Sequence, residues 1–449
     1  MSSPSTIERL SRAALLLISM VLLGSSVYKA LTTSFTHDES LTYNHYVTAP
    51  LGDILTLKEA SPNSHLLNTL LMKAFSAIFG PSPLVLRFPN LLAHLGFLVF
   101  TFLLLRRSHP LLLLPLFILV NANPYLLDFF ALARGNGLSL SFLAGSLFFF
   151  LEFARNCRIR AFTWSSLLAT LAVLSHTTLV YYFLPLSALS LLLPVVQPVL
   201  RPSGAHQTRY PWKGVILVNA LSLLALAALL WVPVHKLVAT GQLFYGGETG
   251  FWKDTVGTLI ETFLYGARAG AGSWVLKGII VMVMVMAPVV LFLRKKDVSG
   301  TTGHDRDLLL LYLLLLSASV IVTAQFYLLG IKLPIRRYGL MFAPLFMLTL
   351  GYLLNFLAED RNGKLVIIFA TWILAGLFTA HTIRSFSSST FLDWTYEKNT
   401  ARMMEVLERD HRGNPSGQPV TMGITWLYEP TINYYRQTRP LSWLQPVTR

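Results

Sequence analysis

Long apolar runs recur along most of the chain and are separated by short polar segments. A helix needs roughly 20 mostly apolar residues to cross the hydrocarbon core of a membrane. Candidate segments cover residues 13–31, 88–105, 111–121, 137–153, 161–175, 178–196, 214–234, 274–293, 308–329, 340–357 and 365–383. The pattern predicts an all-α polytopic membrane protein whose membrane domain spans residues 1–383 and contains about eleven transmembrane helices.

Residues 32–87 interrupt this pattern and form a predicted first outer loop, far longer than the median connection of roughly five residues. Apolar residues at helical spacing over 65–79, closed by Gly80, predict a helix within it. Because this helix is short and contains Asn68 and Lys73, we expect it to lie in the membrane interface. The alternative, a twelfth span, would invert the sidedness of every later loop.

Residues 384–449 are the second polar stretch and predict a small α/β outer tail. Apolar residues separated by charged ones over 396–412 predict an amphipathic helix, which the Gly413-Asn414-Pro415 sequence ends. Residues 420–427 are predicted to form a strand. The aromatic residues that follow, up to Arg436, are expected to pack on the membrane domain, with stacking on a sugar as the alternative.

The net charge is +15, and the basic residues gather in loops that the predicted spans place on one side. These clusters are Arg9 and Arg12; Arg106 and Arg107; Arg155, Arg158 and Arg160; Arg201, Arg209 and Lys213; Arg294, Lys295 and Lys296; Arg361 and Lys364. Since Lys and Arg in short loops stay cytoplasmic, we expect a cytoplasmic N-terminus and an extracytoplasmic C-terminus. Clusters dispersed along membrane edges favour anionic lipid headgroups over nucleic acid as partners. A bacterial inner membrane fits this topology best, although an endoplasmic reticulum membrane would share it.

Acidic residues are scarce, numbering 21 of 449, yet Asp38 and Glu39 stand side by side directly after the first span. A carboxylate beside the bilayer is costly unless it is used. The alternative is a pair of solvated loop carboxylates. The predicted topology places most other candidate acidic residues on the outer side as well, namely Asp53, Glu59, Asp128, Glu248, Asp254 and Glu261. The outer face is therefore where we expect a site.

Several segments together resemble membrane glycosyltransferases of the GT-C type, such as protein O-mannosyltransferases and aminoarabinose transferases. They are His37-Asp38-Glu39-Ser40, the stretch from Asn63 to Leu71, Leu86-Arg87-Phe88-Pro89-Asn90, Asp128 followed by Ala133-Arg134-Gly135, and Pro334-Ile335-Arg336-Arg337-Tyr338. Where relatives often carry a Pro-Pro-Leu element, this chain has Ser64-His65-Leu66, so the sugar and the acceptor stay open. The resemblance implies a hexosyl or pentosyl transfer from a polyprenyl-phosphate carrier to a lipid, glycan or protein acceptor at the outer face, with inversion.

The residue types suit that reaction. An acceptor hydroxyl needs a positioned base, and we assign Asp38 to this role. Glu39 is expected to orient Asp38 or a cation, and Asp128 to assist on the acceptor side. The leaving lipid phosphate calls for arginine, which binds it through two parallel hydrogen bonds. The candidates are Arg87, Arg134, Arg336 and Arg337, with Arg337 favoured, and His65 and Tyr338 complete the predicted substrate-binding set.

Metal binding has little support in the sequence. His37, Asp38, His65, Asp128 and His176 could converge from different loops, but no pair has the spacing of a zinc site. We therefore assign no metal ligand, while a divalent metal stays possible. Two other function classes remain open, a transporter or lipid flippase and a noncatalytic polymerisation partner. Both are weaker, because the spans carry almost no ionisable residue and the polar groups gather in one outer loop.

Overall fold

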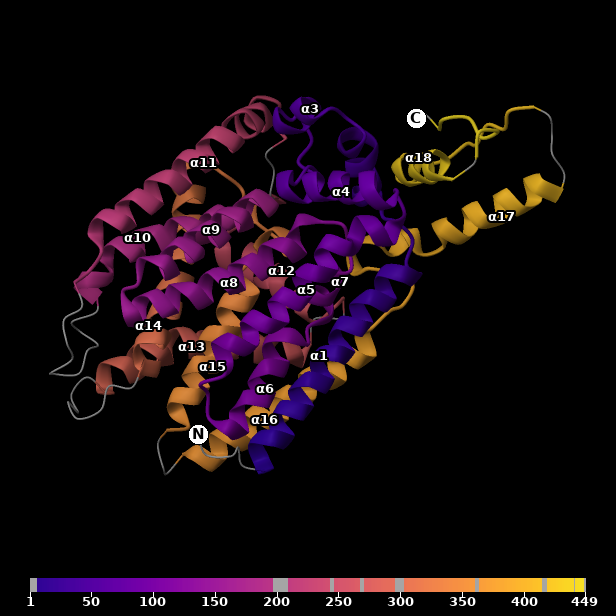
Figure 1. Ribbon diagram of the computed structural model, residues 1–449. Helices are drawn as coiled ribbons and strands as arrows, with labels where there is room; N and C mark the ends of the chain where they lie inside the picture. The colour runs from indigo at the N-terminus through magenta and orange to yellow at the C-terminus, as the bar shows by residue number, and fades with distance from the viewer. Residues whose placement is uncertain are drawn as a thin grey trace.

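The computed structural model describes residues 6–196, 209–242, 246–266, 270–294, 303–359, 363–413, 418–439 and 441–447. It is a bundle of long helices with a cap of short helices at one end (Figure 1). Among the described residues, eight helices are long and apolar enough to cross a membrane. They are α1 (Thr6–Thr32), α5 (Pro83–Leu105), α8 (Gly135–Asn156), α10 (Val180–Val196), α11 (Trp212–Ala239), α13 (Ala271–Arg294), α14 (Gly303–Leu329) and α16 (Lys364–Ser385).

The remaining predicted spans are also helical, so all eleven predicted segments fall on helices. α6 (Pro110–Asn121) and α7 (Pro124–Phe130) form a pair bent by 65° that would count as a ninth span, whereas α9 (Ile159–Ser175) and α15 (Phe342–Leu357) are shorter apolar helices. The bend has a local cause: Asn123 caps α7 by accepting hydrogen bonds from the backbone N–H groups of Tyr125 and Leu126, and Pro124 favours the new helix start. The polytopic all-α fold is confirmed.

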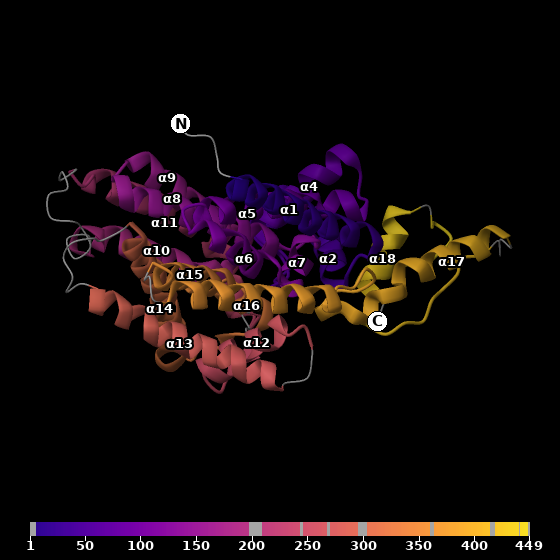
Figure 2. The ribbon, with the colours of Figure 1, turned by 90° about the horizontal axis from the view of Figure 1, so that it is seen from below.

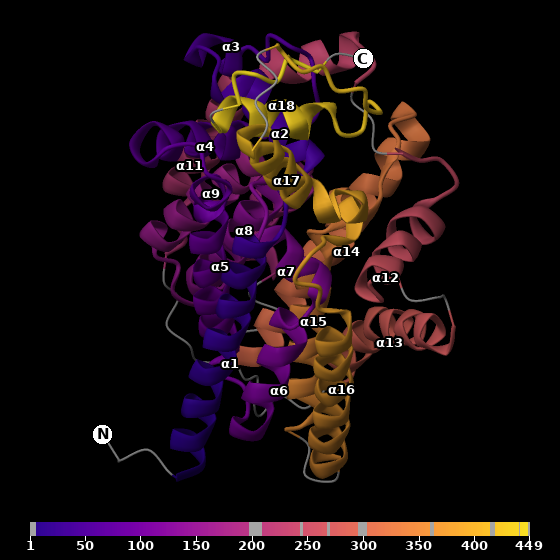
Figure 3. The same cartoon turned by 90° about the vertical axis from the view of Figure 1, so that its right-hand side faces the viewer.

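The first outer loop forms the cap. It contains α2 (His37–Thr42), a π-helical turn η1 (Tyr43–Val47), α3 (Leu51–Leu55) and α4 (Leu66–Phe79). The helix predicted over 65–79 is thus present. Figures 1 and 3 show α3 and α4 at the end of the bundle opposite the start of α1, together with the C-terminal helices.

Shorter elements connect the later helices, and Figure 2 shows α12 and α13 along one flank of the bundle. They are η2 (Thr177–Leu179), β1 (Gly246–Gly247), η4 (Trp252–Val256), α12 (Gly257–Phe263), β2 (Leu333–Pro334) and η5 (Arg336–Gly339). β1 and β2 pair antiparallel over two residues each. Of the basic residues used to orient the chain, Arg201, Lys295, Lys296 and Arg361 lie outside the described residues.

The tail contains η6 (Leu392–Asn399), α17 (Thr400–Gly413) and α18 (Glu429–Thr438). The strand predicted over 420–427 is wrong: this stretch makes one isolated bridge, from Val420 to Leu444. No partner strand extends the bridge in the described tail. Glu429 and Pro430 instead start α18, where an acidic side chain and a proline are favourable.

The tail does not pack as a separate body. Tyr434 and Tyr435 on α18 are buried, and the Tyr434 ring stacks on Phe35 at a centroid distance of 4.2 Å. The Phe35 backbone N–H donates to the Tyr435 hydroxyl over 2.9 Å. The tail and the first outer loop therefore share one small core, which also includes Met72 and Met404.

Candidate active site

Helix α2 carries the two adjacent carboxylates and is fixed by a capping box. The Thr36 side chain accepts a hydrogen bond from the Glu39 backbone N–H, and the Glu39 side chain accepts one from the Thr36 backbone N–H at 2.8 Å. This reciprocal cap directs Glu39 back toward the helix start. Asp38, one position earlier, therefore has a different set of partners.

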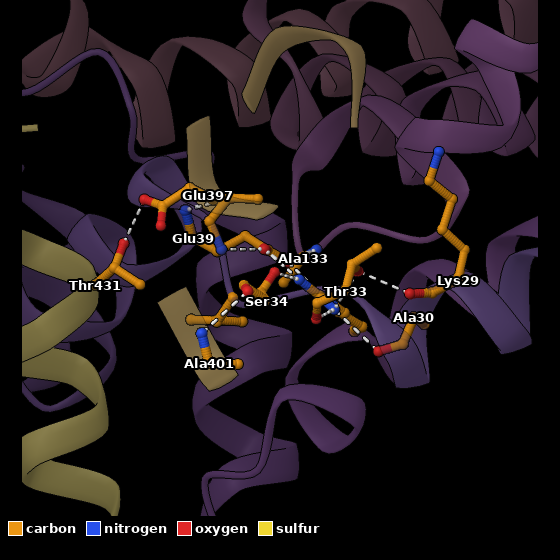
Figure 4. A network of polar contacts seen from close by, with 12 residues as sticks. Lys29, Ala30, Thr33, Ser34, Glu39, Ala133, Glu397, Ala401 and Thr431 are labelled. Atoms are coloured by element: carbon orange, nitrogen blue, oxygen red, sulfur yellow. Dashed lines mark hydrogen bonds and ion pairs between the residues drawn. The ribbon is translucent and has the colours of Figure 1, made fainter. Parts of the chain in front are cut away.

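Glu39 forms an ion pair with Arg87, and neither side chain is exposed to solvent. Two hydrogen bonds of 2.8 and 2.7 Å join the guanidinium to the carboxylate. The Glu39 carboxylate also accepts the Ala133 backbone N–H at 2.6 Å, as Figure 4 shows. The remaining Arg87 donors bind oxygens of Ala30, Thr33 and Ser34. Arg87, expected to contact substrate, instead connects α5 to the loop that precedes α2.

Asp38 lies between two other arginines. Its Oδ2 atom is 3.1 Å from Arg337 Nη2 and 3.6 Å from Arg134 Nη2, and Asn63 donates to Oδ1 over 3.4 Å. Burial raises the pKa of Asp38, but Arg337, Arg134 and nearby His37 outweigh it, so the net pKa is below the ordinary value. The carboxylate is therefore ionised at neutral pH. Its Oδ2 atom is buried and has no hydrogen-bond donor among the described residues.

Arg134 reaches Asp38 from the N-terminal end of α8. It donates hydrogen bonds to the Asn63 backbone and side-chain oxygens over 3.1 and 3.2 Å. The next residue has to be glycine, because a Cβ at Gly135 would lie 1.7 Å from the Ser175 carbonyl oxygen. This close approach brings the start of α8 against the end of α9 and fixes where Arg134 emerges.

Two histidines pack beside these arginines. His65 and His176 stack with ring centroids 4.8 Å apart. Burial and then Arg134 lower the pKa of His65 well below its ordinary value, and the same causes lower the pKa of His176 to about 3. Both rings are therefore neutral, and both Nε2 atoms are buried without a hydrogen-bond partner in the described structure. His65 belongs to the substrate-binding set predicted from the sequence, whereas His176 does not.

The turn η5 carries Arg336 and Arg337, two of the four arginines predicted to bind the phosphate. Asp393 from the tail accepts a hydrogen bond from Arg336 at 2.5 Å and lies 3.8 Å from Arg337 Nη1. Arg337 also lies over the rings of Tyr338 and Trp394, at 5.5 and 5.1 Å. Its guanidinium forms ion pairs but no hydrogen bond within the described residues. It consequently keeps donor capacity for a ligand.

Asp128 has a separate set of partners. Lys29 donates to one of its oxygens, and the Tyr265 hydroxyl and the Leu392 backbone N–H donate to the other, at 2.8 and 2.9 Å. The structure therefore brings Asp38, His65, Arg134, Arg337 and Tyr338 together and leaves Asp128 outside this group. The signal for Lys29 was present in the sequence as a lone cation inside an apolar span.

An apolar cavity of about 220 Å³ adjoins η5. Side chains from η4 and α12 to α15 line it, including Phe251, Leu259, Met284, Ser319, Ala343 and Phe346. A Cβ on Gly339 of η5 would lie 3.4 Å from Thr255 and 3.5 Å from Leu259, both of which line the cavity. The cavity thus begins directly beneath the turn that carries Arg337.

No group of three or more His, Cys, Asp or Glu residues that could hold a metal ion occurs in the part of the chain that the structure describes. The two adjacent carboxylates of α2 are both partnered by cations of the protein itself. Asp38 faces Arg134 and Arg337, and Glu39 faces Arg87.

No family model matches the chain, and no curated protein does. Solved structures do match the chain. ArnT from Cupriavidus metallidurans bound to undecaprenyl phosphate is 10% identical, with a TM-score of 0.51 over 94% of this chain and 84% of ArnT. The chain has the GT-C fold. The arabinosyltransferase EmbB from Mycobacterium smegmatis is 12% identical, with a TM-score of 0.44 over 82% of this chain. The chain covers 36% of EmbB, about a third of its length. The likeness to ArnT confirms the fold expected from the sequence motifs.

Proposed function

We propose that the protein is a membrane glycosyltransferase that moves a sugar from a polyprenyl-phosphate carrier to a lipid, glycan or protein acceptor at the extracytoplasmic face. The observation that carries the proposal is the position of Asp38. This ionised, buried carboxylate lies 3.1 Å from Arg337. The turn η5, which carries Arg337, adjoins an apolar cavity. A base, an anion-binding cation and a hydrophobic channel are the three elements that such a transfer needs.

Asp38 acts as the general base. It takes the proton of the acceptor hydroxyl, whose oxygen then forms a bond to the anomeric carbon. The bond from that carbon to the phosphate oxygen breaks on the opposite face, and the phosphate leaves with the electron pair. The configuration at the anomeric carbon is therefore inverted. Asp38 is deprotonated at neutral pH, as a base has to be, and its Oδ2 atom has no hydrogen-bond partner among the described residues.

Arg337 binds the leaving phosphate, and Arg336 assists. Charge grows on the phosphate as the bond breaks, and a planar guanidinium stabilises it through paired hydrogen bonds. Of the four predicted arginines, Arg87 is saturated by protein partners and Arg134 is bound to Asn63, whereas Arg337 retains its donors. The cavity below η5 takes the apolar chain of the carrier. The undecaprenyl phosphate in the ArnT structure supports this class of donor.

The other predicted residues are assigned by their neighbours. His65 and Tyr338 line the sugar side of the site with Arg134, and His176 joins them through its stacked ring. Glu39 supports Asp38 by fixing α2 through Arg87. Asp128 supports the site through its contacts with Lys29 and the tail. These are roles in holding the reacting groups.

We also propose that the protein lies in a bacterial inner membrane with its N-terminus cytoplasmic. The cap and the tail lie at the end of the bundle opposite the start of α1 (Figure 3), which supports an extracytoplasmic site. Cysteine labelling with a membrane-impermeant reagent, at exposed Ile78 of α4 and at Arg12 near the start of α1, distinguishes the two faces.

The function is tested with purified protein in lipid nanodiscs and a pool of radiolabelled polyprenyl-phosphate sugars with a membrane lipid extract. Wild type is compared with Asp38→Asn and with the control Asp53→Asn, an outer-loop carboxylate paired with exposed Lys58. We expect transfer in wild type and the control, and a loss of about 10² to 10⁴-fold in Asp38→Asn. Transfer that survives in Asp38→Asn would remove this carboxylate as the base. In a parallel assay in sealed liposomes, movement of the carrier lipid between leaflets by a protein that shows no sugar transfer would favour the transporter alternative.

A further inference from the structure

Three consecutive residues near the start of the tail contact Asp128 or the arginines of the candidate site. The Leu392 backbone N–H donates to Asp128 over 2.9 Å, Asp393 faces the arginines of η5, and the Trp394 ring lies 5.1 Å from the Arg337 guanidinium. Asp393 is largely buried, with a side chain 8% exposed. The tail therefore contributes side chains to the site, whereas the sequence pattern predicts only that its later aromatic residues pack on the membrane domain or stack on a sugar.

The Asp393 carboxylate has a divided set of partners. Its Oδ1 atom accepts the Arg336 hydrogen bond, while Oδ2 accepts the Tyr125 hydroxyl at 2.8 Å and lies 3.8 Å from Arg337 Nη1. The other end of the same Arg337 guanidinium lies 3.1 Å from Asp38. The Arg337 guanidinium thus lies between two carboxylates, one from α2 and one from the tail.

The backbone around these arginines is constrained. Arg336 has a φ of +47°, in the left-handed region that L side chains rarely adopt. Its N–H is held by the Thr258 hydroxyl at 2.9 Å, and its guanidinium by Asp393. Such strain persists where surrounding contacts over-determine it. Asp393 is one of the contacts that keep Arg336 and Arg337 directed into the site.

We propose that Asp393 is a positioning residue of the donor-phosphate site: it anchors Arg336 and shares Arg337 with Asp38, so that the Arg337 guanidinium stays between the base and the leaving phosphate. This inference rests on the function proposed above. Two adjacent arginines repel each other, and a single carboxylate that contacts both offsets this repulsion. When the donor binds, the Arg337 guanidinium donates hydrogen bonds to the phosphate, and Asp38 is free to accept the proton.

Without Asp393, Arg337 has one carboxylate left to pair with. It moves fully onto Asp38, where it blocks the base and lowers its proton affinity. Arg336, released from Asp393, still attracts a phosphate. The inference therefore separates two quantities that a merely structural role would change together: turnover falls, while affinity for a phosphate-bearing lipid does not.

The test compares wild type with Asp393→Asn, with the conservative variant Asp393→Glu, and with Glu405→Gln as a matched control. Glu405 is an exposed tail carboxylate 3.6 Å from Arg439 and remote from η5. Binding of undecaprenyl phosphate and of uncharged undecaprenol is measured in phosphatidylcholine nanodiscs, and kcat and donor KM are measured across pH.

Two sets of titratable or charged groups face the carboxylates concerned: His37, Arg134, Arg337 and Tyr396 around Asp38, and Tyr125, Tyr265, Arg336 and Arg337 around Asp393.

We expect Asp393→Asn to lower kcat by about 10²-fold, the cost of a misplaced catalytic group, without weakening the binding of undecaprenyl phosphate. The acid limb of kcat shifts to lower pH, because Arg337 then pairs with Asp38 alone. Asp393→Glu recovers part of kcat, and Glu405→Gln matches wild type.

Unchanged kcat in Asp393→Asn would overturn the inference. A joint loss of kcat and of phosphate-lipid affinity, with no shift in the acid limb of the pH profile of kcat, would also overturn it. That pattern would show that Asp393 only holds the tail in place. Failure of the proposed function gives a different result: wild type itself would not distinguish undecaprenyl phosphate from undecaprenol, whatever residue stands at position 393.

Discussion

Glu39 and Arg87 form a bidentate ion pair in which both side chains have zero exposed fraction. The pair joins the first turn of α2 to α5, 48 positions apart in the chain. It lies one residue from Asp38, so any displacement of Glu39 also moves the proposed base. This contact accounts for the adjacency of the two carboxylates, because one fixes the helix and the other faces the site.

Breaking this pair is expected to destabilise the whole protein. Glu39→Gln leaves the Arg87 guanidinium buried without its counter-charge, which costs about 3–5 kcal/mol of stability. We expect Arg87→Lys to lower the stability as well, because an ammonium cannot reproduce the paired hydrogen bonds. Thermal unfolding of the detergent-solubilised protein measures both effects. A Glu39→Gln variant that melts like wild type would show that the pair contributes little.

The Lys29–Asp128 pair allows a double-mutant cycle. Each side chain is 3% exposed, and the pair links α1 to α7. Lys29→Met leaves a buried carboxylate and Asp128→Leu a buried ammonium, so each single variant loses about 3–5 kcal/mol. The double variant removes both charges, and we expect it to be more stable than either single variant. Additive losses in thermal unfolding would show that the two groups are not coupled.

Local sequence patterns predicted the elements well and the partners poorly. The helix expected over 65–79 is present as Leu66–Phe79, because its apolar spacing and the glycine that ends it are local signals. By contrast, Asp128 pairs with Lys29, 99 positions away. No local pattern encodes such a pairing, since it follows from how helices pack. For the same reason Arg87 was predicted to contact substrate, and Asp393 was not predicted at all.

The tail shows a second kind of failure. Residues 420–427 include Val420, Thr421 and Ile424, residue types that favour strands. Strand propensity measures how well a residue fits an existing sheet, and the described tail offers only the single bridge to Leu444. The capping box between Thr36 and Glu39 is the opposite case, a local pattern that marks the start of α2 although no helix was predicted there.

The apolar cavity leads to a prediction about carrier length. Ser319 of α14 lines the cavity, and Leu328 on the same helix is 79% exposed. Ser319→Phe fills space that the carrier chain would occupy, so we expect the donor KM to rise about tenfold for a long polyprenyl carrier, a loss of roughly 1.4 kcal/mol. A short-chain analogue should be unaffected. Leu328→Phe is the control, and an equal KM change for both chain lengths would exclude this cavity as the carrier site.

Glu397 makes the attachment of the tail dependent on pH. The residue is 3% exposed, and its carboxyl oxygens accept hydrogen bonds from Thr400 and Thr431 at 2.6 and 2.8 Å (Figure 4). Burial, with a smaller contribution from Glu39, raises its pKa to about 7 against the favourable effect of the two hydroxyls. The folded protein therefore binds a proton here that the unfolded chain has already released.

The sign of the effect follows from this difference in proton binding. Below the unfolded pKa both states are protonated; as pH rises toward 7 the unfolded state ionises first, so stability falls by on the order of 3 kcal/mol. Glu397→Gln mimics the protonated acid and should flatten the pH dependence of the unfolding temperature, with greater stability than wild type at pH 7 and above. Glu405→Gln, an exposed carboxylate of α17, is the control. If Glu397→Gln lowered the unfolding temperature at neutral pH, the carboxylate would have to be ionised in the folded tail, with its two threonine hydroxyls stabilising the charge.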